Sequence, residues 1–235
     1  MQKPVIAFRA PTVSYEGHFD KPRIRLINVQ SGTYDLLLDK MLQFGASLQG
    51  FKADVPQDLS RATISVSVLS PFGTAWLSGA SLGLVLNGLP IPPDPDYFGG
   101  IVAELEAVAK EVDGSVAILE HVFTFFGHGD LEGSTPSEFI SRYVAEPPEA
   151  LGPLEYAGAS YVVGAIGSRK RLQLFLEPSL SITPNGLFSR AILTIDAMQV
   201  PAKDAPAEAL KHVKTVLLDP AFPLEIQWKQ SLTQA

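Results

Sequence analysis

Residues 6–20 read IAFRAPTVSYEGHFD and residues 116–130 read VAILEHVFTFFGHGD, so both stretches end in the pattern Gly-His-x-Asp. The pattern falls at Gly17–Asp20 and, 110 residues later, at Gly127–Asp130. From composition alone, a pattern with these three fixed residues arises on the order of 0.02 times in such a chain. Two copies at the ends of similar apolar segments therefore indicate an internal duplication.

Further similarities follow in the same order along both halves of the chain. Gly45-Ala46-Ser47 corresponds to Gly158-Ala159-Ser160, and Ser60-Arg61 corresponds to Ser168-Arg169. The offsets drift slightly, as they would after a duplication followed by changes in loop length. The sequence predicts two copies of one module followed by a C-terminal tail strand, with the bounds 1–112, 113–221 and 222–235.

The second module shows the expected elements most clearly. Val116–Phe126 is rich in β-branched and aromatic residues, which are typical of a strand. Thr135-Pro136-Ser137-Glu138 combines an N-cap residue, a proline at the first helical position and a capping-box glutamate, which predicts a short helix through Val144. The remaining expected elements of this module are strands at 156–166, 171–177 and 188–198 and a closing helix that begins at Pro206.

The first module is expected to repeat this order, with helices at Thr33–Phe44 and Asp96–Val112. In the second of these helices, apolar residues recur at helical spacing along one face. This module also carries an insertion, Arg23–Val29, whose alternation of apolar and polar residues predicts a surface strand.

Strands joined by short turns and closed by a helix are typical of antiparallel sheets with helices on one side, an α+β class. The predicted β-α-β-β-β-α order resembles the helix-grip or TATA-binding-protein-like topology, in which a curved antiparallel sheet wraps a long C-terminal helix. The resemblance covers both modules at the level of topology and implies that they pack about a pseudo-two-fold axis. No sequence motif of either family is present.

Composition narrows the classes of function. The chain has 235 residues, 46% of them hydrophobic, and can bury a sizeable core. Its 18 Lys and Arg against 25 Asp and Glu give a net charge of −7, which opposes binding to a nucleic-acid backbone. Absent cysteine excludes a disulfide framework and a thiol enzyme. No apolar run reaches the roughly 18 residues of a membrane span, so a cytoplasmic protein without a membrane partner is expected.

The paired His-x-Asp motifs are the sharpest candidates for chemistry. At strand spacing, His18 and Asp20 point to the same side, and so do His128 and Asp130. If the modules pack with these segments together, four ligands for a divalent metal ion would converge. The alternative is local: glycine and aspartate serve a turn, and the histidines pack or face water. The same residues would then carry no cofactor.

Three classes of function stay open. The first is a non-catalytic binding or assembly protein that presents a groove or a sheet edge to a protein partner or to itself, favoured because nucleophile-elbow and phosphate-loop motifs are absent. The second is a helix-grip pocket for a small apolar ligand. The third is a metal-dependent hydrolase built on the paired His-x-Asp motifs. The residues expected to line the apolar pocket are Phe123, Phe125, Leu174 and Leu176.

Overall fold

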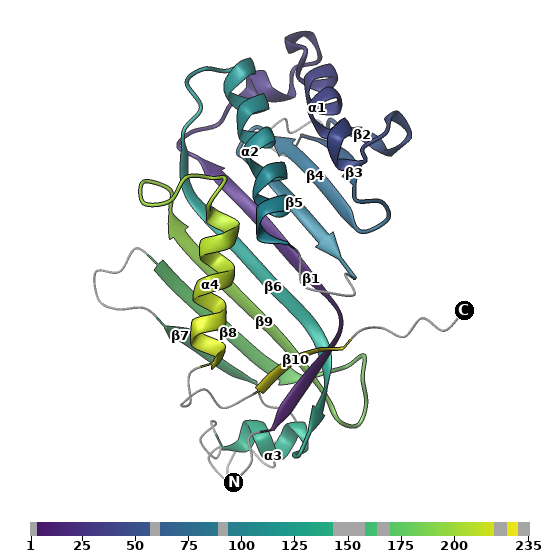
Figure 1. The fold of residues 1–235 in the computed structure, drawn as a ribbon, viewed down its shortest axis with the longest axis vertical. Helices are drawn as coiled ribbons and strands as arrows, with labels where there is room; N and C mark the ends of the chain where they lie inside the picture. The colour runs from purple at the N-terminus through teal and green to yellow at the C-terminus, as the bar shows by residue number, and fades with distance from the viewer. Residues whose placement is uncertain are drawn as a thin grey trace.

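Two long antiparallel strands form the centre of the fold. The computed structural model describes residues 4–56, 62–88, 94–142, 158–163, 170–218 and 225–229. The two stretches that carry Gly-His-x-Asp lie in β1 (Val5–Phe19) and β6 (Ile118–Glu132), which pair along nearly their whole length. Figure 1 shows this pair running through the middle of one large sheet.

The sheet has ten strands, in the order β2-β3-β4-β5-β1-β6-β9-β8-β7, with β10 pairing β1 off this path. Neighbours along the path are antiparallel, whereas β10 runs parallel to the first residues of β1. The strands beside β1 are β2 (Phe51–Asp54), β3 (Thr63–Val68), β4 (Gly73–Ser78) and β5 (Ser81–Asn87). Those beside β6 are β7 (Ala159–Val163), β8 (Lys170–Pro178) and β9 (Gly186–Asp196), and the tail forms β10 (Glu225–Lys229).

Helices cover one face of the sheet, as Figure 1 shows for α1, α2 and α4. The α-helices are α1 (Thr33–Met41), α2 (Pro95–Val112), α3 (Pro136–Ser141) and α4 (Ala205–Leu218). Local signals start two of them: the Asp94 carboxylate accepts from the Asp96 N–H, and Thr135 and Glu138 form a reciprocal capping box. Short 3-10 helices are η1 (Ile24–Ile27), η2 (Val29–Ser31), η3 (Leu42–Phe44) and η4 (Leu48–Gly50).

The core lies between the helices and the covered face of the sheet. Alternate residues of each strand point to that face, so that burial alternates along β3, β6 and β9. Tyr15 of β1 and Phe98 of α2 both contact the Phe123 ring, at centroid distances of 5.1 and 6.4 Å. The opposite face of the sheet carries no helix of the described residues.

The glycines of the repeated motif serve close packing rather than turns. Gly17 and Gly127 both lie inside strands, and neither has a positive φ. A Cβ at Gly17 would lie 2.7 Å from the Tyr15 hydroxyl oxygen, and one at Gly127 would lie 3.0 Å from the Phe8 ring. The expectation that these glycines shape turns is therefore corrected, because the strands continue through both positions.

A mixed architecture with a large antiparallel sheet and few helices agrees with the predicted α+β class. The expected surface strand at Arg23–Val29 is wrong, since these residues form η1 and the start of η2. Leu26 and Ile27, adjacent in sequence, are both buried, which an alternating strand cannot achieve. The first half also has one strand more than expected, β2. The duplication and the module bounds stay predictions.

Candidate functional site

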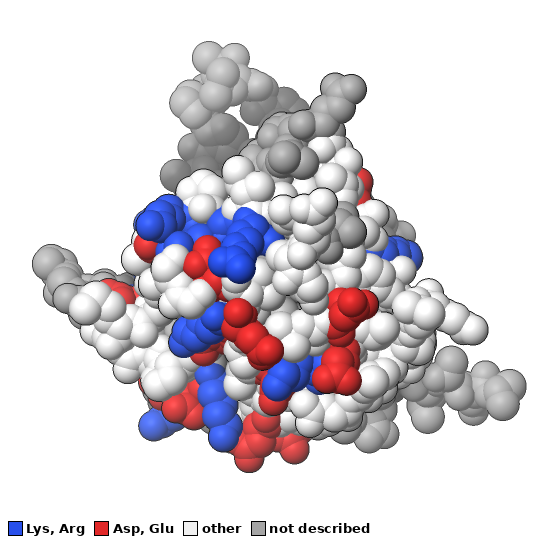
Figure 2. Space-filling model, turned by 90° about the horizontal axis from the view of Figure 1, so that it is seen from above, with Lys and Arg blue, Asp and Glu red and all other residues white. Residues whose placement is uncertain are grey.

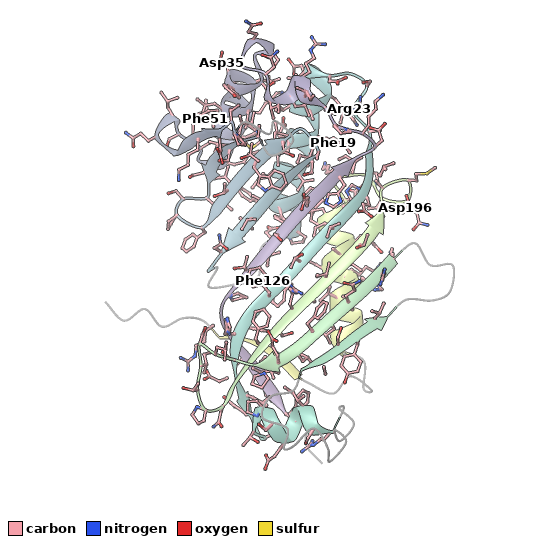
Figure 3. The ribbon with its side chains drawn as sticks, turned by 180° about the vertical axis from the view of Figure 1, so that it is seen from behind. Phe19, Arg23, Asp35, Phe51, Phe126 and Asp196 are labelled. Atoms are coloured by element: carbon pink, nitrogen blue, oxygen red, sulfur yellow. The ribbon has the colours of Figure 1, made fainter. Side chains whose placement is uncertain are left out.

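The uncovered face of the sheet is the candidate functional surface. Figure 3 shows it from behind the helices, with Phe126 labelled near its centre. On the first half of the chain it presents mainly small polar side chains such as Ser14, Ser65 and Thr74, as a solvated antiparallel face normally does, together with Trp76, whose ring lies over Gly83. Two groups on this face differ from that background, one polar and one aromatic.

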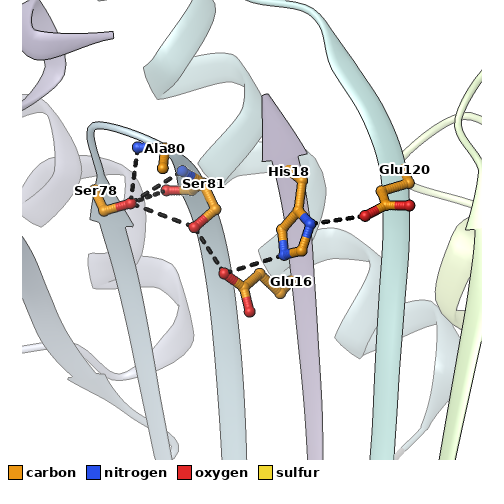
Figure 4. Close-up of polar contacts among 6 residues, drawn as sticks. All are labelled: Glu16, His18, Ser78, Ala80, Ser81 and Glu120. Carbon is orange, nitrogen blue, oxygen red and sulfur yellow. Dashed lines mark hydrogen bonds and ion pairs between the residues drawn. The ribbon is translucent and has the colours of Figure 1, made fainter. Parts of the chain in front are cut away.

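A polar cluster joins β5, β1 and β6 at one end of the face (Figure 4). The Ser81 hydroxyl donates to Glu16 Oε1 at 2.8 Å, and the same oxygen lies 3.3 Å from His18 Nε2. His18 Nδ1 lies 2.9 Å from Glu120 Oε1. Ionised carboxylates only accept, so both contacts are satisfied together when both ring nitrogens of His18 carry protons.

The chemistry of this polar cluster is that of a stabilising network. A serine nucleophile needs a histidine that takes its proton, whereas Ser81 donates to a carboxylate. The side chains of Glu16, His18 and Glu120 are 40–44% exposed, so water competes with each contact. The geometry therefore provides no activated nucleophile at this place.

The second copy of the motif has different partners. His128 Nδ1 lies 2.8 Å from the Ser179 hydroxyl, and Arg9 forms a two-pronged ion pair with Asp130 at 2.8 and 2.7 Å. The hydrogen bond and charge of Asp130 raise the pKa of the Arg9 guanidinium. Asp130 is thus engaged by an arginine.

Asp20, which follows β1, is also engaged by an arginine. It accepts from the buried Arg23 at 2.5 Å, and this hydrogen bond is the main reason why the pKa of Asp20 lies below its usual range. Arg23 also donates to the Ser115 hydroxyl and carbonyl oxygens, at 2.5 and 2.7 Å. Arg23, at the start of η1, thereby ties Asp20 at the end of β1 to the loop between α2 and β6.

The structure does not bring the four predicted metal ligands together. His18 pairs with Glu120, whereas His128 lies eight residues further along β6, opposite Arg9. At about 3.3 Å per residue, that separation is roughly 26 Å. The reason is strand direction: β1 and β6 are antiparallel, so motifs near the C-terminal end of each strand fall at opposite ends of the pair. No group of three or more metal-binding side chains occurs among the described residues.

The expected apolar pocket is reduced to a small cavity. Phe123 and Phe125 line it together with Leu210 of α4, and its volume is about 40 Å³. Pockets for small ligands usually measure roughly 300–1,000 Å³. Leu174 and Leu176 are buried in the same face of the sheet but do not line the cavity.

His121 is buried in the core and only 1% exposed. Its Nε2 donates to the Val200 carbonyl at 2.9 Å, because a carbonyl oxygen only accepts, and its Nδ1 lies 3.0 Å from the Tyr15 hydroxyl. Burial lowers the pKa of His121 and raises the pKa of Tyr15 above its usual range. The sequence showed no sign of the Tyr15 partner, which comes from a strand 106 residues away.

The second group on the uncovered face is an aromatic patch on β6, β8 and β9. Arg190 pairs in register with both Phe126 and Phe175, and its guanidinium carbon lies 4.5 Å from the centroid of the Phe175 ring. The rings of Phe126 and Phe188 are 6.4 Å apart. We call this set the aromatic patch: Phe126, Phe175, Phe188, Arg190 and Ile192. Its rings and Ile192 are only half-buried and Arg190 is exposed.

Comparisons with known proteins establish no family. No family model and no curated protein matches the chain. Among solved structures it is similar to Methanococcus jannaschii TBP, at 13% identity and a TM-score of 0.25, over 92% of this chain and 100% of that chain. It is also similar to an unknown protein from Galdieria sulphuraria, at 10% identity and a TM-score of 0.16, over 88% of this chain and 94% of that chain.

In the ranges that the structure describes, no helix combines the length and the apolar character needed to cross a bilayer.

Proposed function

We propose that this chain is a non-catalytic binding or assembly protein that holds a protein partner on the uncovered face of its sheet. The observation that carries the proposal is the aromatic patch, which lies on the face opposite α1, α2 and α4. Aromatic residues and arginine are the types most enriched in protein interfaces and at their energetic centres.

The size of the face supports a protein partner. Nine strands about 4.8 Å apart, with roughly six residues each at about 3.3 Å, give a face of roughly 800 Å². A stable protein interface takes about 800 Å² from each partner. A partner of protein size can therefore be held on this face.

The charges near the aromatic patch favour protein over nucleic acid. Arg9 is paired with Asp130, and Glu177 lies on the same face, paired in register with Phe188. The upper end of the molecule, seen in Figure 2, also mixes basic and acidic side chains. A phosphate backbone is bound by an excess of positive charge, which agrees poorly with this mixture and with the net charge of −7.

The internal duplication belongs to the same proposal. In each half, the last strand before the closing helix lies beside the first strand, so that the order is β1-β5-β4-β3 on one side and β6-β9-β8-β7 on the other. This order supports two modules, 1–112 and 113–221, related by a pseudo-two-fold axis between β1 and β6. The aromatic patch lies only on the second half of the chain. The face is therefore asymmetric, so that a partner would bind it in one orientation.

Site-directed photo-crosslinking in the source cell tests the proposal. A photoreactive phenylalanine analogue replaces Arg190 in the aromatic patch, or the exposed Ala207 of α4 as a control. We expect one defined adduct from position 190 and none from position 207, and we expect Phe188→Ser to abolish that adduct. The adduct partner, once identified by mass spectrometry, should bind the purified chain and not its Phe188→Ser variant.

Two outcomes would overturn the proposal. One is an adduct of equal yield from both positions, and the other is an adduct that is unaffected by Phe188→Ser and by a second variant, Phe175→Ser. Melting temperatures of all variants, measured beforehand, separate loss of binding from loss of folding. Light scattering of the purified chain over a wide concentration range shows whether the partner is a second copy.

A further inference from the structure

Helix α1 presents a partly exposed stripe on the side away from its buried residues. Its buried residues are Thr33, Leu37 and Met41, which face the sheet and α2. On the outer side, four residues follow the spacing i, i+3, i+4 and i+7, which places them along one face of a helix. They alternate between aspartate and leucine: Asp35, Leu38, Asp39 and Leu42. Leu42 is the first residue of η3, whose helical backbone continues that of α1, and Leu38 is partly buried against the core.

This stripe borders a shallow groove. The groove has a volume of about 610 Å³. Gly32 and Leu36 line it together with the four residues of the stripe. Leu42 is 53% exposed, and Leu36 and Leu38 remain partly exposed in the groove lining. Large apolar side chains that stay accessible around a depression are typical of a site for another chain. Figure 3 labels Asp35 at the α1 end of the molecule.

The carboxylates of this groove are without partners among the described residues. Neither Asp35 nor Asp39 forms an ion pair or a side-chain hydrogen bond there. Lys40, the basic residue next to Asp39, extends instead to Glu104 of α2, with its Nζ 3.6 Å from Oε2. The groove therefore combines one exposed and two partly exposed leucines with two uncompensated negative charges about one helical turn apart.

We propose that the α1 groove binds a basic amphipathic helix of a partner protein. Apolar residues of such a helix would contact Leu38 and Leu42, while its Lys or Arg side chains would reach Asp35 and Asp39. Binding of an amphipathic helix in an apolar groove is a recurring mode of recognition. Charge complementarity selects a basic helix, because an acidic or neutral one leaves both carboxylates uncompensated.

This site is separate from the aromatic patch. The groove lies on α1, on the helix-covered side of the sheet, whereas the aromatic patch lies on the uncovered side, on the other half of the chain. The two surfaces can be occupied at once, so that the chain would join two partners. Variants of one surface should leave binding at the other unchanged.

A designed peptide tests the groove directly. The probe is a fluorescent helical peptide of Lys and Leu only, with leucine at the spacing i, i+3, i+4 and i+7, titrated with the full-length protein by fluorescence anisotropy. We expect Asp35→Asn with Asp39→Asn to weaken binding by about twofold to thirtyfold, as expected for two exposed ion pairs. Leu42→Ser should weaken it by about fivefold, as expected for partial burial of one leucine.

Matched controls separate the groove from general attraction to an acidic protein. Glu111→Gln with Asp54→Asn removes the same charge from exposed residues elsewhere, and Leu180→Ser removes a leucine that is 87% exposed on the other half. These variants should bind the peptide as the wild type does. A peptide of the same composition in scrambled order should bind less well to the wild type.

Three results would overturn the inference. They are equal weakening by groove and control variants, equal binding of ordered and scrambled peptides, and no binding at all. If the groove variants instead dissociate a dimer of the purified chain, the occupant is a second copy and the proposed partner helix is wrong. Melting curves confirm that each variant is folded before it is titrated.

Discussion

Replacing Tyr15 by Phe tests the buried hydrogen bond between β1 and β6. The Tyr15 hydroxyl is 3.0 Å from His121 Nδ1, and both residues are 1% exposed. The substitution keeps the ring, which packs on Phe123 at a centroid distance of 5.1 Å. It leaves Nδ1 as a buried acceptor without a donor, which costs about 1–3 kcal/mol.

Urea unfolding followed by circular dichroism measures this cost. We expect the midpoint to fall with an unchanged m-value, and the melting temperature to fall by roughly 2–4 °C for each kcal/mol. Tyr34→Phe is the matched control, because its hydroxyl is half-buried and 3.5 Å from the Ile27 carbonyl oxygen. A Tyr15→Phe protein as stable as this control would refute the buried hydrogen bond.

The same site predicts how stability depends on pH. Burial lowers the pKa of His121 below its ordinary value of 6.5, so the unfolded chain binds this proton more readily than the folded chain does. The contribution of His121 is therefore complete above about pH 6.5 and declines as the pH falls below that value. Carboxylates with a lowered pKa, such as Asp20, act in a lower window, since their contribution is lost as the pH falls below about 3.8.

Urea midpoints measured from pH 8 to pH 5 test this dependence. Wild type should lose stability between pH 6.5 and pH 5, with a slope of at most about 1.4 kcal/mol per pH unit from one group. His121→Phe should lack that component. Parallel curves for the two proteins would contradict a lowered pKa at His121.

Three further predictions concern packing and metal binding. Arg23→Met should lower the free energy of unfolding by about 2–3 kcal/mol in urea, since it removes a buried charge from partly solvated partners; a loss below about 1 kcal/mol would contradict this role. Gly83→Ala should shift the fluorescence emission of Trp76, because the new Cβ would lie 2.3 Å from its ring, and an unchanged spectrum would show that the indole lies elsewhere. Zinc or manganese should leave the melting temperature unchanged, because His18 and His128 lie far apart. A metal-dependent rise in melting temperature that is removed by replacing His18 and equally by replacing His128 would contradict the observed register.

Much of the local structure was predictable from short-range signals. The capping box at Thr135 and Glu138 predicted where α3 begins, because such a signal acts within one turn of the chain. The helical spacing of apolar residues predicted α2 to within one residue of its observed start. The rich β-branched and aromatic content of residues 116–126 predicted a strand there. The prediction of a strand at Arg23–Val29 was wrong because the same alternation of apolar and polar residues is compatible with a strand and with buried 3-10 turns. The tertiary contacts of Arg23 decide between the two.

The candidate site was predictable only in part. Because neighbouring residues of a strand point to opposite faces, the run from Phe123 to Phe126 must carry aromatic rings on both faces, and the structure has Phe123 on the covered face and Phe126 in the aromatic patch. Nothing in the sequence indicated that Arg190 would lie between two phenylalanines from different strands. That neighbourhood follows from sheet register, which a single strand does not encode.

The sequence by itself determined the order of the long strands and helices and the faces that alternate between apolar and polar residues, although it predicted neither β2 nor η1. These depend on caps, periodicity and composition, which are properties of neighbouring residues. Only the tertiary structure decided that His18 meets Glu120 and lies far from His128, because strand direction and register join residues more than 100 positions apart. For the same reason, only the register of β6, β8 and β9 decided that the aromatic patch forms on the face opposite the helices.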